Sequence, residues 1–167
     1  LIKENYSTWS NFNFRSILIS VDPKSKRCQT TLKKLNNLDI KPDIFLAKTP
    51  KDLPQYLTST HLISRSKPVQ IATFLSHLLS IRYALKKFDD DTFLIFEDDA
   101  ILFPDPLLVG LGKAIENQDW EVLQLEHHDA EGIKRFINLY NKGVLLHRWR
   151  RSDFGTSAYL IRRKFAE

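Results

Sequence analysis

The sequence lacks the residues that define several protein classes. Its 167 residues include no methionine and a single cysteine, Cys28. One cysteine excludes an internal disulfide and any zinc site built from several cysteines. Apolar runs such as residues 92–96 and 100–103 fall far short of the roughly 20 residues that a membrane-spanning helix needs. We therefore expect neither a disulfide scaffold nor a segment that crosses a bilayer.

The chain also has no repeat of fixed period and no low-complexity segment. Hydrophobic residues make up 43% and charged residues 27%, which excludes a disordered or collagen-like chain. Lys and Arg number 25 against 20 Asp and Glu, so the net charge is +5. This charge suits an anionic ligand, but by itself it does not indicate nucleic acid.

We divide the chain into an irregular lead-in at residues 1–15 and one domain at residues 16–167. The lead-in mixes Asn, Ser and aromatic residues without a sustained period, and the remaining length fits one core. Because the sequence starts at Leu1 and has no methionine, we expect the natural start, with any signal or anchor, to lie before it. The compartment stays open between the secretory lumen and the periphery of the cytoplasmic membrane.

Strand and helix patterns alternate along the domain. Short apolar, β-branched runs bounded by turn residues predict strands at residues 16–21, 44–47, 92–96, 120–125, 143–146 and 158–161. Apolar residues at helical spacing predict a helix around Cys28 and Leu35, a second at residues 70–88, a third after Pro104, and the start of a fourth at residues 162–167. This alternation favours an α/β sandwich.

Three consecutive carboxylates, Glu97, Asp98 and Asp99, follow the strand expected at residues 92–96. They would repel one another at the rim of a low-dielectric sheet unless solvent or a cation compensates. In extended chain Glu97 and Asp99 point to one side, so they could face one ligand while Asp98 turns away or pairs with a base. Hard oxygen ligands favour Mg²⁺ or Mn²⁺ over zinc. The alternative is a solvated acidic turn.

Two further clusters have less specific patterns. Residues 127–129 (HHD) resemble metal ligands, but adjacent side chains diverge and no second histidine pair has helical spacing, so we interpret them as a loop. Residues 147–151 (HRWRR) could hold phosphate, contact a sugar, stack on bases or form an amphipathic edge strand. Elsewhere basic and acidic residues are interleaved, so we do not expect a nucleic-acid partner.

Several segments, taken in order, resemble glycosyltransferase family 25, which contains lipooligosaccharide and collagen-type galactosyltransferases. Residues 17–27 (ILISVDPKSKR) resemble the opening strand of that family, and residues 74–77 (FLSH) resemble its Leu-Ser-His helix. Residues 93–100 (FLIFEDDA) are similar to its Glu-Asp-Asp metal motif, and residues 155–164 (GTSAYLIRRK) to its Gly-Thr-x-Ala-Tyr-Leu-Ile segment. The resemblance runs from about residue 16 to the last residue.

The chain departs from the family pattern in two places. The family usually carries Glu and Gly-Cys just before Leu-Ser-His, whereas residues 69–73 of this chain read VQIAT. The family also continues past the Ala-Tyr-Leu-Ile segment. We therefore expect part of the domain on the acceptor side to lie beyond Glu167.

The resemblance implies a GT-A-like α/β fold, with a mostly parallel sheet between helices and a nucleotide-sugar donor at the strand ends. The implied activity is an inverting, divalent-metal-dependent transfer of a hexose from a UDP-sugar to a hydroxyl of a glycan or protein, with galactose favoured over glucose. The metal, Mn²⁺ or Mg²⁺, would be held by Asp99 with Glu97 or Asp98 against the donor diphosphate. Arg27 would help position the nucleotide.

The resemblance also places Ser76 and His77 beside the donor, and it calls for a group that deprotonates the acceptor hydroxyl. Our candidates for that group are His77, Asp129 and Asp153, with Glu126 and His128 left open. Each candidate also has a role without function. The acidic residues could be solvated charges on a loop, and His77 could make a structural hydrogen bond. The expected site residues are Glu97 and Asp99 for the metal; Arg27, Ser76, His77 and Asp98 for the donor; and His77, Asp129 and Asp153 for catalysis.

Two other functions stay open. A domain of this lineage without turnover could act as a binding module for a sugar nucleotide or glycan. A metal-dependent phosphotransferase or nuclease could use the same carboxylates, but the chain has neither a Gly-rich phosphate loop nor an Asp-x-Asp-x-Thr segment after a strand.

Overall fold

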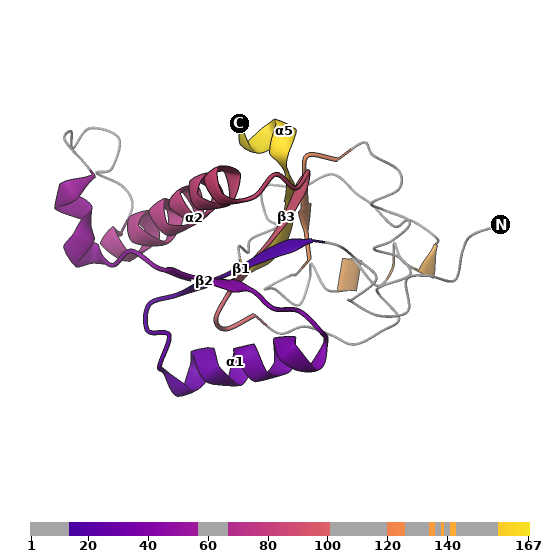
Figure 1. Ribbon diagram of the computed structural model, residues 1–167, viewed down its shortest axis with the longest axis horizontal. Helices are drawn as coiled ribbons and strands as arrows, with labels where there is room; N and C mark the ends of the chain where they lie inside the picture. The colour runs from indigo at the N-terminus through magenta and orange to yellow at the C-terminus, as the bar shows by residue number, and fades with distance from the viewer. Residues whose placement is uncertain are drawn as a thin grey trace.

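A central sheet between helices organises the protein in the computed structural model (Figure 1). The structure describes residues 14–56, 67–100, 120–125, 134–135, 138, 141–142 and 157–167. The elements are β1 (Arg15–Ser20), α1 (Lys26–Asn37), β2 (Asp43–Leu46), the 3₁₀ helix η2 (Pro50–Gln55), α2 (Pro68–Lys87), β3 (Thr92–Glu97), β4 (Val122–Gln124), β5 (Ala158–Arg162) and α5 (Arg163–Ala166).

The strands at residues 16–21, 44–47, 92–96 and 158–161 are confirmed to within about a residue, and the run at 120–125 forms the shorter β4. The helix expected at 70–88 begins earlier, at Pro68, because proline suits the first position of a helix. The strand expected at 143–146 and the helix after Pro104 lie outside the described residues.

The five strands form one open mixed sheet in the order β2-β1-β3-β5-β4. β1 pairs in parallel with β2 and with β3, whereas β5 is antiparallel to both β3 and β4. Four strands therefore share one direction and β5 alone is reversed. The expected mostly parallel sheet is right for β1 to β3, but the sequence pattern gave no sign of the reversed strand between β3 and β4.

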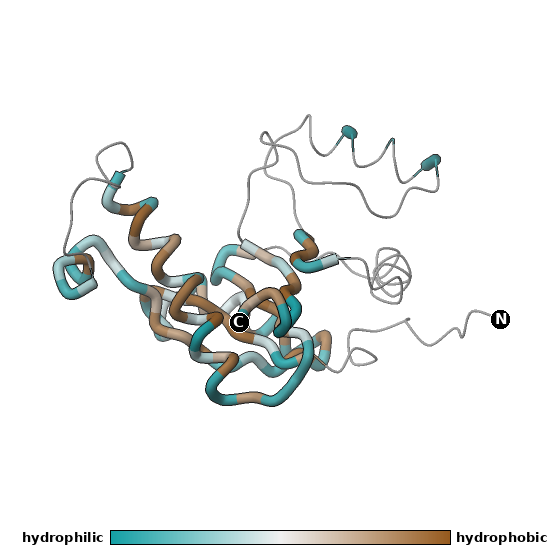
Figure 2. The backbone as a smooth tube through the Cα atoms, turned by 90° about the horizontal axis from the view of Figure 1, so that it is seen from above, coloured by the Kyte–Doolittle hydropathy of each residue, from teal (hydrophilic) through white to brown (hydrophobic). Residues whose placement is uncertain are grey.

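Each face of the sheet packs against its own helices, as the three layers in Figure 1 show. Successive side chains of a strand point to opposite faces. In β1, Leu18 therefore joins the cluster on the α1 side, while Ile17 and Ile19 join the cluster on the α2 side. In β3, Leu94 and Phe96 face α1; Phe93 and Ile95 face α2. Hydrophobic and hydrophilic stretches alternate along α2 in Figure 2, but the buried residues of this helix are small or polar, and its Phe74 and Leu78 are exposed.

Side-chain hydrogen bonds cap the starts of both long helices. The Ser25 side chain accepts a hydrogen bond from the Cys28 backbone N–H and caps the start of α1, five residues after the end of β1. At the start of α2, the Gln70 side chain accepts a hydrogen bond from the Lys67 N–H. The first residues of both helices are thereby set by local hydrogen bonds.

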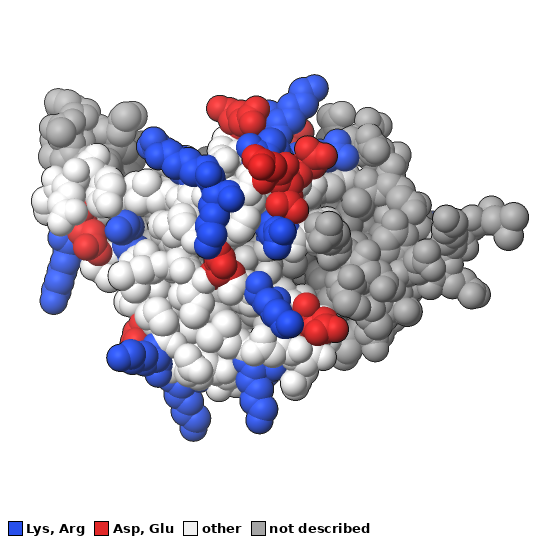
Figure 3. Space-filling model, viewed as in Figure 1, with Lys and Arg blue, Asp and Glu red and all other residues white. Residues whose placement is uncertain are grey.

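Charged side chains of both signs lie next to one another on the face shown in Figure 3. Ion pairs join Arg15 to Asp90, Lys87 to Asp43 and Arg163 to Glu167. The hydrogen bond from Lys87 holds the pKa of Asp43 below its ordinary value. The excess positive charge is therefore not gathered into one patch on this face.

None of the described helices is long and apolar enough to cross a membrane.

The buried sheet predicts a large difference between two identical substitutions. Leu94 in β3 is 2% exposed, whereas Leu46 in β2 is 58% exposed. Leu94→Ala should lower the free energy of unfolding by about 2 to 5 kcal/mol, because it removes buried contacts and leaves a cavity. Leu46→Ala should change it by less than about 0.5 kcal/mol. Urea unfolding measures both, and equal losses would contradict the assigned layers.

Candidate functional site

The carboxyl ends of β1, β2 and β3 meet at one edge of the sheet, because these strands are parallel neighbours. Ser20, Leu46 and Glu97 are the last residues of the three strands. Open α/β sheets bind their ligands at this kind of edge. The candidate site is therefore built from strand ends and from residues of the helices α1 and α2 beside them.

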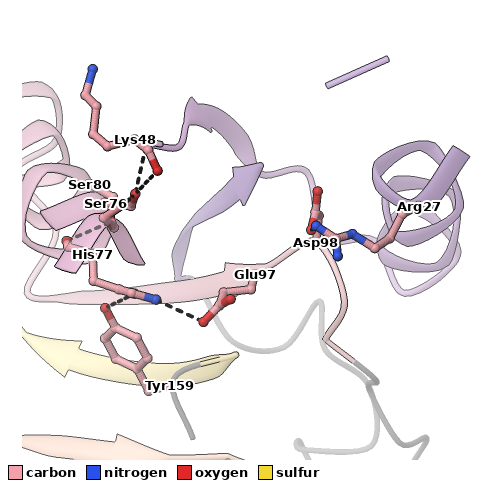
Figure 4. Close-up of polar contacts among 9 residues, drawn as sticks. Arg27, Lys48, Ser76, His77, Ser80, Glu97, Asp98 and Tyr159 are labelled. Atoms are coloured by element: carbon pink, nitrogen blue, oxygen red, sulfur yellow. Dashed lines mark hydrogen bonds and ion pairs between the residues drawn. The ribbon is translucent and has the colours of Figure 1, made fainter. Parts of the chain in front are cut away.

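The acidic residues at the end of β3 diverge to opposite sides of the sheet. Glu97 continues the face of Phe93 and Ile95 and turns towards α2, while Asp98 continues the other face and turns towards α1. Figure 4 shows the two side chains separating in this way. Neighbouring carboxylates therefore meet different partners, which reduces their repulsion.

All three oxygen atoms of Asp98 contact other residues of the protein. Its Oδ1 contacts Nη2 of Arg27 at 2.6 Å, and its Oδ2 accepts a hydrogen bond from Ser20 Oγ, also at 2.6 Å. Its backbone carbonyl accepts a hydrogen bond of 2.7 Å from Thr31 Oγ1 on α1. The residue is only 3% exposed, so these contacts replace water for a buried charge.

His77 on α2 links Glu97 to Tyr159 on β5 (Figure 4). Its Nε2 lies 3.1 Å from Glu97 Oε1, and its Nδ1 lies 3.0 Å from the Tyr159 hydroxyl. A carboxylate can only accept, so with a neutral imidazole Nε2 carries the hydrogen and Tyr159 donates to Nδ1. Burial, and secondly the charge of Glu97, raise the pKa of Tyr159 far above its ordinary value. The hydroxyl therefore stays protonated and available to donate.

Ser76 connects the end of β2 to α2. Its hydroxyl accepts a hydrogen bond of 2.7 Å from the Lys48 backbone N–H and donates one of 2.7 Å to the Ala72 carbonyl. The residue is 2% exposed. Its contacts fix the position of the neighbouring His77, whose own carbonyl accepts a hydrogen bond from Ser80.

A pocket of about 70 Å³ opens between these elements. Such a volume holds several water molecules or one small polar group, well below the roughly 300 to 1,000 Å³ of pockets that enclose a whole ligand. It is lined by Ile19, Val21, Arg27, Ala47, Lys48, Thr73, Ser76, His77, Glu97 and Asp98. Thr73 belongs to the segment in which the chain departs from the family pattern, and that segment forms the first turns of α2.

The structure brings together five of the site residues expected from sequence, since Arg27, Ser76, His77, Glu97 and Asp98 all line this pocket. Asp99 is exposed on the turn that follows β3 and does not line the pocket. The expectation that it shares a side with Glu97 assumed extended chain, whereas β3 ends at Glu97. The candidate bases Asp129 and Asp153, like Glu126 and His128, lie outside the described residues.

Sequence reasoning missed the residues that hold the acidic pair. Ser20 and Thr31 each bond Asp98, and Tyr159 bonds His77. Ser20 directly follows the apolar residues 17–19 of β1, and Tyr159 lies between apolar residues of β5; a polar group beside such a run is the signal that could have identified them. Thr31 has no comparable signal, since threonine is ordinary on a helix surface.

The described residues fit a weakly coordinated cation better than a protein cage. Among them, no group of three His, Cys, Asp or Glu is placed to hold a metal ion. Mg²⁺ commonly binds through one or two carboxylates together with substrate phosphates and water, and Glu97 and Asp99 offer oxygens of that kind. Asp98 is less suited to the role, because it is buried and its two carboxylate oxygens already contact Arg27 and Ser20.

The buried Tyr159 predicts a characteristic alkaline unfolding. Above pH 10 the unfolded chain releases its tyrosine protons, whereas folded Tyr159 keeps its own because its pKa is raised. The unfolded state then binds fewer protons, so stability falls as pH rises, by up to about 1.4 kcal/mol per pH unit. Tyr159→Phe should remove this part of the slope, although it costs about 0.5 to 1.5 kcal/mol near pH 7 through the lost hydrogen bond.

Urea unfolding between pH 8 and pH 11 measures the effect. Tyr56 is 41% exposed, so Tyr56→Phe serves as the control and should keep the slope of the unmodified chain. A Tyr159→Phe variant with that same slope would contradict the buried, protonated hydroxyl.

Comparison with known proteins agrees with this geometry. The sequence profile of glycosyltransferase family 25, described as an LPS biosynthesis protein, matches residues 14–167. No individually curated protein matches the sequence. The match covers nearly the whole chain and includes every described element of the site. The chain therefore belongs to glycosyltransferase family 25.

Proposed function

We propose that this glycosyltransferase moves a hexose, with galactose favoured, from a UDP-sugar to a hydroxyl group. The observation that carries the proposal is that one pocket, at the carboxyl edge of the parallel strands, is lined by both Arg27 and Glu97. A guanidinium suits phosphate oxygens, and a carboxylate suits a divalent cation. The diphosphate of a sugar nucleotide, together with its divalent cation, is a ligand that would use both groups.

Glu97 and Asp99 are the residues that would hold Mn²⁺ or Mg²⁺. Such an ion would supply positive charge against the negative charge that develops on the departing UDP. Glu97 is held towards the pocket by His77, and Asp99 lies two residues further along on the exposed turn. The contribution of the protein is thus one fixed carboxylate and one solvent-facing carboxylate.

His77 acts in this proposal by orienting Glu97. Both of its ring nitrogens are already engaged, one by Glu97 and the other by Tyr159. An imidazole in that arrangement must give up a hydrogen bond before it can take a proton from an acceptor. Asp129 and Asp153 accordingly remain our candidates for the general base, and His77 becomes a positioning residue.

The transfer breaks the bond between the sugar C1 and the diphosphate oxygen and forms a bond from C1 to the acceptor oxygen. The acceptor hydroxyl gives its proton to the base, and UDP leaves with the bonding electrons. Attack from the side opposite the leaving group inverts the anomeric centre. The description of the family as an LPS biosynthesis protein supports a saccharide as the acceptor.

Calorimetric titration of UDP and UDP-galactose, with and without Mn²⁺, tests the proposal. We expect metal-dependent binding that Asp99→Asn weakens at least tenfold, because the substitution removes a charged oxygen ligand. Asp89→Asn is the matched control: Asp89 is equally exposed but precedes β3, at the opposite end of the strand. That control should bind like the unmodified chain.

The outcomes separate the candidate functions. Binding together with galactosyl transfer to a saccharide supports the enzyme. Binding of UDP-galactose without hydrolysis or transfer favours a binding module of the same fold. A folded chain that binds neither nucleotide, with or without Mn²⁺, would contradict the donor site.

A further inference from the structure

The Asp98 carboxylate is the most strongly constrained charged group of the pocket. Its two oxygens meet Arg27 and Ser20 at 2.6 Å each, and its carbonyl meets Thr31. Two elements, β1 and α1, supply the partners of this one residue, which directly follows β3. With one protein contact on each oxygen and 3% of the residue exposed, this carboxylate is turned towards the protein rather than towards a ligand.

The Arg27 guanidinium contacts Asp98 through one nitrogen and is otherwise accessible from the pocket. Its Nη2 contacts Asp98, yet its side chain is 58% exposed and lines the pocket. A guanidinium carries five N–H donors, so one contact leaves most of them for an anion. Within the described part of the chain, Asp98 is the only acidic residue that pairs with Arg27.

We infer that Asp98 is a positioning residue that holds the Arg27 guanidinium in place as a pyrophosphate-binding group. This inference rests on the proposed function for the identity of the natural ligand, a nucleoside diphosphate. A free arginine side chain has many rotamers, and freezing them on binding reduces affinity. Asp98 imposes that order before the anion arrives, since Ser20 and Thr31 hold Asp98 itself.

A competing interpretation predicts the opposite effect of mutation. If Asp98 only neutralised Arg27, its negative charge would repel a bound anion, and Asp98→Asn would tighten anion binding. If Asp98 positions Arg27, the same substitution frees the guanidinium and weakens binding. The direction of the change therefore distinguishes the two roles.

The experiment is a double-mutant cycle, with metal-free inorganic pyrophosphate as the probe and calorimetry as the measurement. We expect Asp98→Asn to weaken pyrophosphate binding about tenfold, and Arg27→Ala to weaken it further. Added to Arg27→Ala, Asp98→Asn should have no additional effect, because the group it positions is gone. Arg27→Lys should also lose affinity, since it keeps the charge but loses the planar fork.

Two further variants protect the test against a folding defect. Ser20→Ala removes only the second hydrogen bond to Asp98, so it should give a smaller loss that also vanishes beside Arg27→Ala. Asp43→Asn removes the acidic partner of a different ion pair, formed with the last residue of α2; neither member of that pair lines the pocket, so affinity should be unchanged. Circular dichroism and urea unfolding establish that each variant is folded.

The remaining outcomes are decisive. Unchanged or tighter binding by Asp98→Asn overturns the inference, as does an equal loss in the presence and absence of Arg27. An unmodified chain that does not bind pyrophosphate overturns it as well. A chain that binds pyrophosphate with the expected coupling but binds neither UDP nor UDP-galactose supports the inference while the proposed function fails.

Discussion

The alternation of side chains along β3 is the constraint on which the site depends. β3 lies in the middle of a sheet covered on both faces, so successive residues belong to different layers. Two neighbouring acids at its end consequently separate, Glu97 to the α2 layer and Asp98 to the α1 layer. A shift of one residue would exchange their partners, and it would also move the whole apolar set of the strand to the wrong faces.

The two acids have different tasks because their surroundings differ. Asp98 is buried, and each of its oxygens has a protein donor, which a buried charge needs in order to be tolerated. Glu97 remains partly open to the pocket, with 26% of its side chain exposed, and His77 holds it from one side. Asp98 therefore stabilises the arrangement of the surrounding elements, and Glu97 is accessible to a ligand in the pocket.

The segment that departs from the family pattern, just before Leu-Ser-His, still forms the start of a helix. Gln70 accepts a hydrogen bond from Lys67, and Pro68 takes the first helical position, so α2 starts without the usual Glu and Gly-Cys. Ser76 and His77 still reach the end of β2 and the end of β3. One of the changed residues, Thr73, lines the pocket wall.

The sequence alone determined the principal strands, both long helices, the family and five of the residues that line the pocket, because apolar periodicity and local motifs are properties of short segments. Only the tertiary structure decided the reversed direction of β5 and the roles of Tyr159, Ser20 and Thr31. Those features depend on contacts between residues 62 to 82 positions apart in the chain, from Phe96 with Ala158 to His77 with Tyr159. No local pattern encodes which distant strand will lie beside β3, and for that reason the partners of the two acids became known only when the layers were assembled.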